Sequence, residues 1–125
     1  MTASPAQDSV ESRGPGFAVL YRVRLHPGME HAYVSAWGRV TAALRTQRGG
    51  LGSRLHRGPD DIWYAYAQWP SAEARRAAFA LGPVDEAAEK QMASAVSERF
   101  PEIVLEPMSD YLLPGPYEAP SERTI

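Results

Sequence analysis

The sequence predicts an α+β fold of the ferredoxin-like type, in which a four-stranded antiparallel sheet carries its helices on one face. Two observations support this prediction. Between residues 17 and 113 the predicted elements follow the order β-α-β-β-α-β, with apolar residues at period two in strands and at spacings of three and four in helices. Glycine and proline punctuate the boundaries between these segments. The length of 125 residues suits one domain, and we expect it to span residues 17–113.

The first strand and the first helix are predicted from a change of period. Residues 17–25 alternate as a strand, and one face carries Phe17, Val19, Tyr21, Val23 and Leu25. A His-Pro-Gly turn at 26–28 follows. Residues 29–47 then have the spacing of an amphipathic helix, with apolar positions at Tyr33, Ala36, Trp37, Val40 and Leu44. Two glycines at 49–50 are expected to end this helix.

The next segment predicts a β-hairpin. Residues 51–57 (LGSRLHR) and 62–69 (IWYAYAQW) both alternate with period two, and the turn GPDD at 58–61 joins them. Pro70 ends the second strand. Ser71 is a suitable cap for an alanine-rich helix over residues 71–81.

The last predicted helix and strand follow an interruption at Gly82-Pro83. The apolar stripe continues through Val84, Ala88, Met92, Ala95 and Val96, so the helix is expected to run on until Pro101 stops it. Residues 102–113 predict the final strand, in which Pro107 indicates an edge position or a bulge. The polar and proline-containing segments 1–16 and 114–125 predict a disordered N-terminal segment and an irregular tail.

Composition limits the function. The net charge of -2 and its mixed sign give no reason to expect nucleic acid or an anionic membrane as a partner. There is no cysteine, which rules out a disulfide framework, a thiolate metal site and a cysteine nucleophile. No apolar run approaches the roughly 20 residues of a membrane helix, and we expect a cytoplasmic location. His26 and His31 do not share a helical face, so no metal site is predicted.

The two faces of the sheet can be distinguished by side-chain size. Ala65 and Ala67 allow helices to approach closely, so this set, with Trp63 and Trp69, is assigned to the helix side. The opposite, helix-free face is predicted to carry Leu20, Arg22, Arg24, Arg54, His56, Ile62, Tyr64, Tyr66 and Gln68. A surface that is partly apolar and partly cationic indicates an interaction site. We expect a second copy of the chain to cover it, so that the polar residues line a pocket.

The HPG turn before a tryptophan-bearing helix, followed by GGLGSRLHR and YAYAQWPS, resembles the antibiotic biosynthesis monooxygenase family. The resemblance covers most of residues 17–113. It implies a homodimeric α/β barrel with a pocket either between the sheet and helices of each subunit or at the junction of the two sheets. It also implies oxidation of phenolic polyketides to quinones with O2 and without metal, flavin or other cofactor.

The resemblance is incomplete at the site. The oxygenase branches of the family use an active-site asparagine, and this sequence has no asparagine. Tryptophan, tyrosine and arginine, which the quinone-forming branch also uses, are present. Haem-degrading relatives need an iron ligand, usually a helix histidine, and His31 in the first helical turn does not suit that role, so haem is not expected.

The candidate catalytic residues are His56, Arg54 and Tyr66. His56 can accept a proton near neutral pH, and an arginine can stabilise the resulting enolate or phenolate in a dry pocket. The candidate substrate-binding residues are Arg22, Arg24, Tyr64, Gln68 and Trp63. Each has an ordinary alternative: an exposed strand histidine, ion pairs across a dimer interface, interface tyrosines, or a core tryptophan.

Taken together, these residues favour a cofactor-independent monooxygenase that acts on an aromatic polyketide-like or quinol small molecule. Two alternatives stay open. A polyketide cyclase or isomerase would use the same pocket, because an enolate also serves an aldol closure. A dimeric module that binds a small molecule without catalysis would need the same fold.

Overall fold

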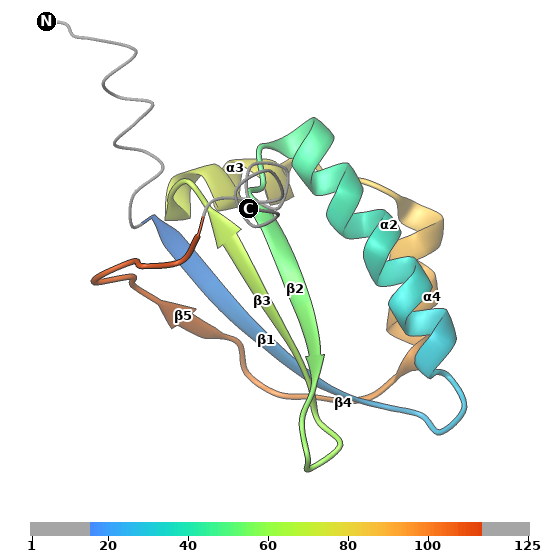
Figure 1. Ribbon diagram of the computed structural model, residues 1–125. Coiled ribbons are helices and arrows are strands. Elements are labelled where there is room, and N and C mark those ends of the chain that lie inside the picture. Colours follow the sequence, from blue (N-terminus) through green and yellow to red (C-terminus); the bar gives the residue numbers. More distant parts are fainter. Residues whose placement is uncertain (1–15, 114–125) are drawn as a thin grey trace, which may run out of the picture.

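The computed structural model describes residues 16–113. Its elements are β1 (Phe17–Leu25), α2 (Glu30–Arg48), β2 (Gly52–Arg57), β3 (Trp63–Trp69), α3 (Ala72–Ala80), α4 (Glu86–Ala95), β4 (Val96–Arg99) and β5 (Ile103–Leu105) (Figure 1). Apart from Gly16, the predicted disordered segment 1–16 and the predicted tail 114–125 lie outside the described residues. Within that range, no helix has the length and apolar character needed to cross a membrane.

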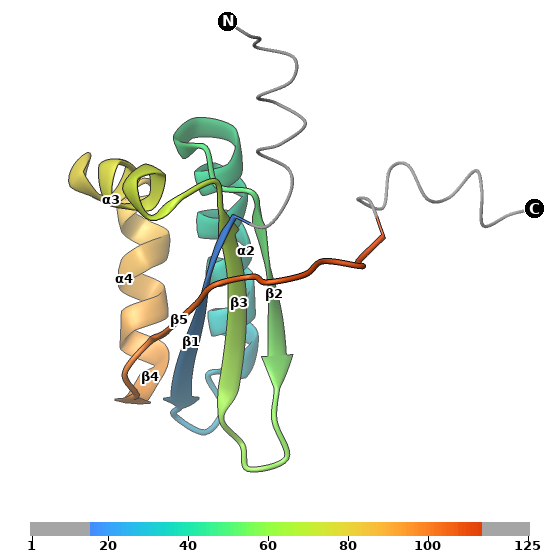
Figure 2. The same cartoon turned by 90° about the vertical axis from the view of Figure 1, so that its left-hand side faces the viewer.

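The strands form one antiparallel sheet with the order β2-β3-β1-β4. Strand β1 is therefore central, and its outer edge is shared: β4 pairs with Val23–Leu25 and β5 with Ala18–Leu20. The three helices of the described chain cover one face (Figure 1), and Figure 2 shows α2 behind the strands when the molecule is turned by 90°. This arrangement confirms the predicted ferredoxin-like fold.

The ends of the first two helices follow from local chemistry. Gly49 adopts φ 83°, a left-handed conformation that ends α2. The Ser71 hydroxyl accepts a hydrogen bond of 3.0 Å from the Ala74 N–H and so caps α3. Both devices were expected from the sequence.

The last helix is shorter than predicted. It ends at Ala95, and Val96–Arg99 forms β4, whereas the sequence pattern continued the helix to Pro101. Val96 pairs with Leu25, and the Ala95 carbonyl accepts a bond of 2.9 Å from the His26 N–H. Strand pairing of Val96 with β1 thus outweighs the helical spacing of apolar residues in the sequence. Valine is β-branched and therefore fits a strand well.

The last strand is also shorter than predicted, since only Ile103–Leu105 of the segment 102–113 pairs with β1. Pro107 has no N–H to donate to a ladder, which is consistent with the end of pairing before it. Tyr21 and Arg22 of β1 pair with neither β4 nor β5. The linker 100–102, which joins β4 to β5, passes beside these two residues.

The core lies between the sheet and the helices. The sheet contributes buried Val19, Val23, Leu25, Ala65 and Trp69, and the helices contribute buried Tyr33, Ala36, Ala78, Ala88 and Ala95. The alternation of β3 thus places Ala65 and Trp69 on the helix side, as predicted. The opposite face has no helix over it.

Candidate active site

A cavity of about 720 Å³ lies between the sheet and the helices. Its floor is formed by strand residues and its walls by helix residues; among them are Tyr21, Ser53, Ala65, Ala67, Trp69, Trp37, Thr41, Arg48, Phe79, Glu89 and Met92. Ala65 pairs with Leu55 of β2, and Ala67 pairs with Ser53. The small side chains of the two alanines leave room above the sheet. The volume falls in the range of roughly 300–1,000 Å³ that small-molecule sites occupy.

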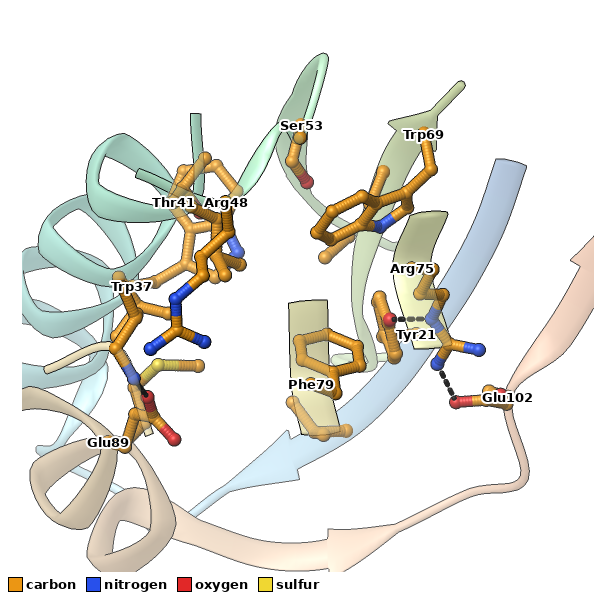
Figure 3. Close-up of a pocket in the computed structure, with 18 of the residues that line it drawn as sticks. Tyr21, Trp37, Thr41, Arg48, Ser53, Trp69, Arg75, Phe79, Glu89 and Glu102 are labelled. Atoms are coloured by element: carbon orange, nitrogen blue, oxygen red, sulfur yellow. Dashed lines mark hydrogen bonds and ion pairs between the residues drawn. The ribbon is translucent and has the colours of Figure 1, made fainter. Parts of the chain in front are cut away.

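Aromatic side chains form much of the cavity wall. Trp69, at the end of β3, is 2% exposed, and its ring meets that of Phe79 edge to face at a centroid distance of 5.6 Å. In Figure 3 the Trp69 ring points toward Thr41 and Arg48 of α2. Trp37, from α2, is half-buried and lines the cavity as well. Such flat surfaces are suited to stacking against a planar ring.

One end of the cavity is polar. Arg75, from α3, donates from Nε to the Tyr21 phenol oxygen at 3.1 Å and from Nη2 to the Glu102 carboxylate at 2.8 Å (Figure 3). Its guanidinium carbon lies 5.6 Å from the Tyr21 ring centroid and 5.3 Å from that of Phe79. The Arg75 side chain is only 18% exposed. This fixes a cation and a phenol beside the aromatic walls.

The protonation of Tyr21 follows from its surroundings. Burial raises the pKa of the Tyr21 phenol above its usual value, and the opposing effect of Arg75 does not cancel this. The phenol therefore keeps its proton at neutral pH. Since its oxygen accepts a hydrogen bond from Arg75, its own O–H can donate to a molecule in the cavity. Burial likewise raises the pKa of Tyr33, which also lines the cavity.

Two further charged residues support the cavity wall. Arg48 donates to the carbonyls of Ala78 at 2.7 Å and Gly82 at 3.0 Å, and so ties the end of α2 to the α3–α4 connection. Glu89 accepts from the N–H of Val84 at 2.8 Å, at the start of α4. Both side chains are engaged with backbone groups, which indicates a structural role.

The predicted residues Arg54, His56, Tyr64 and Tyr66 lie on the helix-free face, outside this cavity. Cross-strand pairing places His56, Tyr64 and Arg22 in one row and Arg54 and Tyr66 in the next. His56 is exposed, with Nδ1 3.3 Å from the Tyr64 carbonyl oxygen. The assignment of these residues to the helix-free face is confirmed, and their catalytic and binding roles stay predictions.

Two of the predicted binding residues, Arg22 and Gln68, border the cavity. These two and Arg24 are held by partners within the chain. Arg24 pairs with Glu98 at 3.3 Å on the surface, and Arg22 donates to the Pro101 carbonyl at 2.8 Å. Gln68 donates to the Tyr66 hydroxyl at 3.1 Å. Both residues of this last pair border a second hollow of about 530 Å³ beside residues 105–112. Trp63 packs on the helix side against Tyr33, at the margin of the core.

The sequence interpretation missed the polar end of the cavity. The sequence predicts Tyr21 only as a residue of a strand face, while Arg75 and Glu102 belong to a helix and a linker without any motif. The available signal is the pair Ala65 and Ala67, whose small side chains leave space for a ligand as well as for helices. Of the two pocket locations that the resemblance implied, the structure contains the one between sheet and helices.

Comparison with known proteins agrees with this fold. The model of the antibiotic biosynthesis monooxygenase family matches residues 16–90. ActVA-Orf6, a monooxygenase of Streptomyces coelicolor solved with nanaomycin D, is 24% identical with a TM-score of 0.63, over 81% of this chain and 94% of that chain. SnoaB, a cofactor-independent oxygenase of Streptomyces nogalater, is 17% identical with a TM-score of 0.63, over 78% and 97%.

A search of curated proteins finds no significant match. At these identities the solved structures establish the fold, and the family model covers more than half of the sequence. The chain belongs to the antibiotic biosynthesis monooxygenase family.

Proposed function

We propose that this chain is a monooxygenase that oxidises a planar, phenolic, polyketide-like molecule with O2 and without metal or flavin. The observation that carries the proposal is the combination, in one cavity, of flat aromatic walls with a polar end at Tyr21 and Arg75. Membership of the family supports the reaction class. The nanaomycin D bound to ActVA-Orf6 supports the class of ligand.

The cavity suits a fused aromatic ring system. The ring would lie above Ala65 and Ala67, with Trp37 and Phe79 available for stacking or edge contacts. A hydroxyl or carbonyl oxygen at one end of the ring would then reach the Tyr21 O–H. Burial of most of a ligand against apolar walls, with few polar contacts to orient it, is the usual design of such sites.

The chemistry begins with a substrate such as a hydroxyanthrone, which loses a proton from its ring CH2 to form an enolate. The enolate passes one electron to O2, and the two radicals combine as a peroxide. Loss of water then leaves a quinone carbonyl: one oxygen atom of O2 stays on carbon, and the other leaves in water with both hydrogens. The protein stabilises the enolate oxygen through the Tyr21 O–H and the nearby Arg75 cation.

The described residues that line the cavity include no side chain well suited to accept the proton of the substrate. No histidine is among its described lining residues, and its two carboxylates are engaged, Glu89 with backbone N–H groups and Glu102 with Arg75. Anion stabilisation is therefore the main contribution of the protein, and the favoured substrates are phenolic systems that ionise readily. The predicted role of His56 as a base applies only to a ligand bound on the helix-free face.

The test is oxygen uptake with a hydroxyanthrone in the presence of a metal chelator. We expect one quinone per O2 and a loss of about 100-fold in kcat for Tyr21→Phe, the effect of removing one oxyanion donor. His56→Ala and Arg54→Ala are the matched controls on the opposite face and should keep wild-type kcat. Loss in the controls with normal turnover by Tyr21→Phe would overturn the proposed site. Ring closure of an open-chain polyketide without oxygen uptake would support the cyclase.

The proposal includes a homodimer formed through the helix-free face. This face exposes Ile103 by 39%, next to the half-buried Leu20 and Tyr66, and such a patch favours association. Light scattering after size exclusion should give twice the chain mass for wild type and for the control Val34→Glu on α2. Leu20→Glu should give a monomer. A wild-type monomer would contradict this part of the proposal.

A further inference from the structure

The linker 100–102 between β4 and β5 contacts both sides of the sheet edge. On one side, Arg22 donates from Nη2 to the Pro101 carbonyl at 2.8 Å, and its guanidinium carbon lies 5.7 Å from the Phe100 ring centroid. The Phe100 N–H donates to the Arg22 carbonyl at 3.1 Å. On the other side, Glu102 accepts from Arg75. The linker thus joins a residue of the helix-free face to the polar end of the cavity.

Glu102 fixes the orientation of the Arg75 guanidinium, which the bond to the Tyr21 phenol alone would not fix. Arg75 has a long side chain, and ordering it costs rotamer entropy. The bond from Arg75 to Tyr21 has an uncharged acceptor, so it is weaker than a bond to a carboxylate. The bond to Glu102 is charge-assisted and therefore stronger. Because Nε and Nη2 bond to different partners, the plane of the guanidinium is held against both.

Arg22 in turn fixes the linker. The guanidinium stacks near Phe100 and bonds to Pro101, whose ring restricts the backbone next to Glu102. The Nε of Arg22 is buried without a hydrogen-bond partner among the described residues, which costs free energy. The remaining contacts of Arg22 with the linker must offset that cost.

We propose that Glu102 is a positioning residue that holds Arg75 against the Tyr21 phenol, and that Arg22 supports it by anchoring the linker from the opposite face. The inference rests on the proposed function, since it assigns a positioning role to residues of the same site. It gives Arg22, a predicted substrate-binding residue that borders the cavity, a supporting role through the linker. It also links the geometry of the cavity to whatever covers the helix-free face.

Two substitutions of Glu102 separate positioning from simple charge. Glu102→Gln removes the charge and keeps an acceptor for Arg75, while Glu102→Leu removes both. The negative charge of Glu102 raises the pKa of Tyr21, and Arg75 lowers it. If Glu102 acted through charge alone, both variants would lower the pKa of Tyr21. If it positions Arg75, Glu102→Leu releases the cation and raises that pKa, whereas Glu102→Gln lowers it.

The measurement is an NMR titration of carbon-13-labelled tyrosine, with Tyr21→Phe to assign the signal, together with the Nε–H resonance of Arg75 at neutral pH. We expect Glu102→Leu to raise the pKa of Tyr21, to broaden or lose the Arg75 signal, and to reduce kcat about tenfold, equivalent to ~1.4 kcal/mol. Arg22→Met should change all three in the same direction and by less. Glu102→Gln should keep most of kcat, and so should the matched control Glu98→Gln, which removes a surface carboxylate paired with Arg24.

A lowered pKa of Tyr21 in Glu102→Leu, or an unchanged Arg75 signal, would overturn the inference. Both NMR readouts need no turnover. If wild type takes up no oxygen while the titration behaves as expected, the proposed reaction fails and the positioning role stands.

Discussion

The two faces of the sheet present the same residue types in different surroundings. On the helix-covered face, Arg75 is 18% exposed and bonds to both Tyr21 and Glu102. On the helix-free face, Arg24 is 40% exposed and pairs with Glu98 on the surface. An exposed pair of this kind contributes little, because water solvates and screens both charges. A cation held beside a cavity wall acts on a bound ligand far more strongly.

The contrast extends to neighbouring residues of one strand. Tyr21 and Arg22 follow each other in β1, yet the first reaches into the cavity and the second bonds to the linker from the other side. A catalytic site here depends less on which residue types a face carries than on which face the helices enclose.

The largest expected effect concerns Trp69, which belongs to both the core and the cavity. Trp69→Ala should lower the free energy of unfolding by about 3–5 kcal/mol, the usual cost of removing a buried aromatic ring. Arg54→Ala, on the exposed part of the helix-free face, should change it by less than about 0.5 kcal/mol. Denaturant unfolding measures both. Similar losses would mean that the two faces contribute equally to stability.

Substitutions of Arg48 and Arg24 allow the contribution of arginine hydrogen bonds to stability to be compared between the two faces. Arg48→Met removes bonds to the carbonyls of Ala78 and Gly82 and should cost about 1.5–3 kcal/mol in the free energy of unfolding. Arg24→Met should cost about 0.2–1 kcal/mol. Equal costs in denaturant unfolding would show that Arg48 does not brace the α3–α4 connection.

Filling the space above Ala67 should weaken ligand binding. Ala67→Leu places additional atoms in the cavity and should raise the Kd of a hydroxyanthraquinone at least tenfold, or ~1.4 kcal/mol. Arg54→Leu changes a residue of the helix-free face that does not line the cavity, and should leave Kd within about twofold. Quenching of tryptophan fluorescence reports the binding. The reverse ranking of these two variants would place the ligand on the helix-free face.

The smallest expected effect is a dependence of stability on alkaline pH. The pKa of Tyr21 is raised in the folded chain by burial, so its contribution to stability is complete below its ordinary value of 10.0 and is lost as the pH rises through the folded value. Tyr21→Phe should therefore reduce the decline of stability above that pH. Tyr33 shifts in the same direction and should maintain part of the decline. An unchanged pH profile in Tyr21→Phe would contradict a buried, protonated phenol.

The sequence was sufficient for the fold because its signals are local. The alternation of residues 17–25 and 62–69 predicted two central strands and their faces, and Gly49 and Ser71 marked helix ends that the structure contains. The signal failed where distant pairing decides. Val96 continues a helical stripe in the sequence, but pairing with Leu25 makes it a strand residue.

The polar end of the cavity could not be predicted for a related reason. Tyr21, Arg75 and Glu102 are brought together by the sheet edge, the packing of α3 and the linker, and no spacing in the sequence records these three contacts. His56, Tyr64 and Arg22, by contrast, form a row through strand pairing alone. Sequence reasoning therefore found the residues that strand pairing aligns and missed those that helices and linkers supply.

The most direct test of the central claim is a crystal structure with a hydroxyanthraquinone bound. We predict density for the ring above Ala65 and Ala67, with one of its oxygens within hydrogen-bonding distance of the Tyr21 hydroxyl. A ring bound instead on the helix-free face, against Tyr64 and His56, would contradict the account and restore the site expected from the sequence.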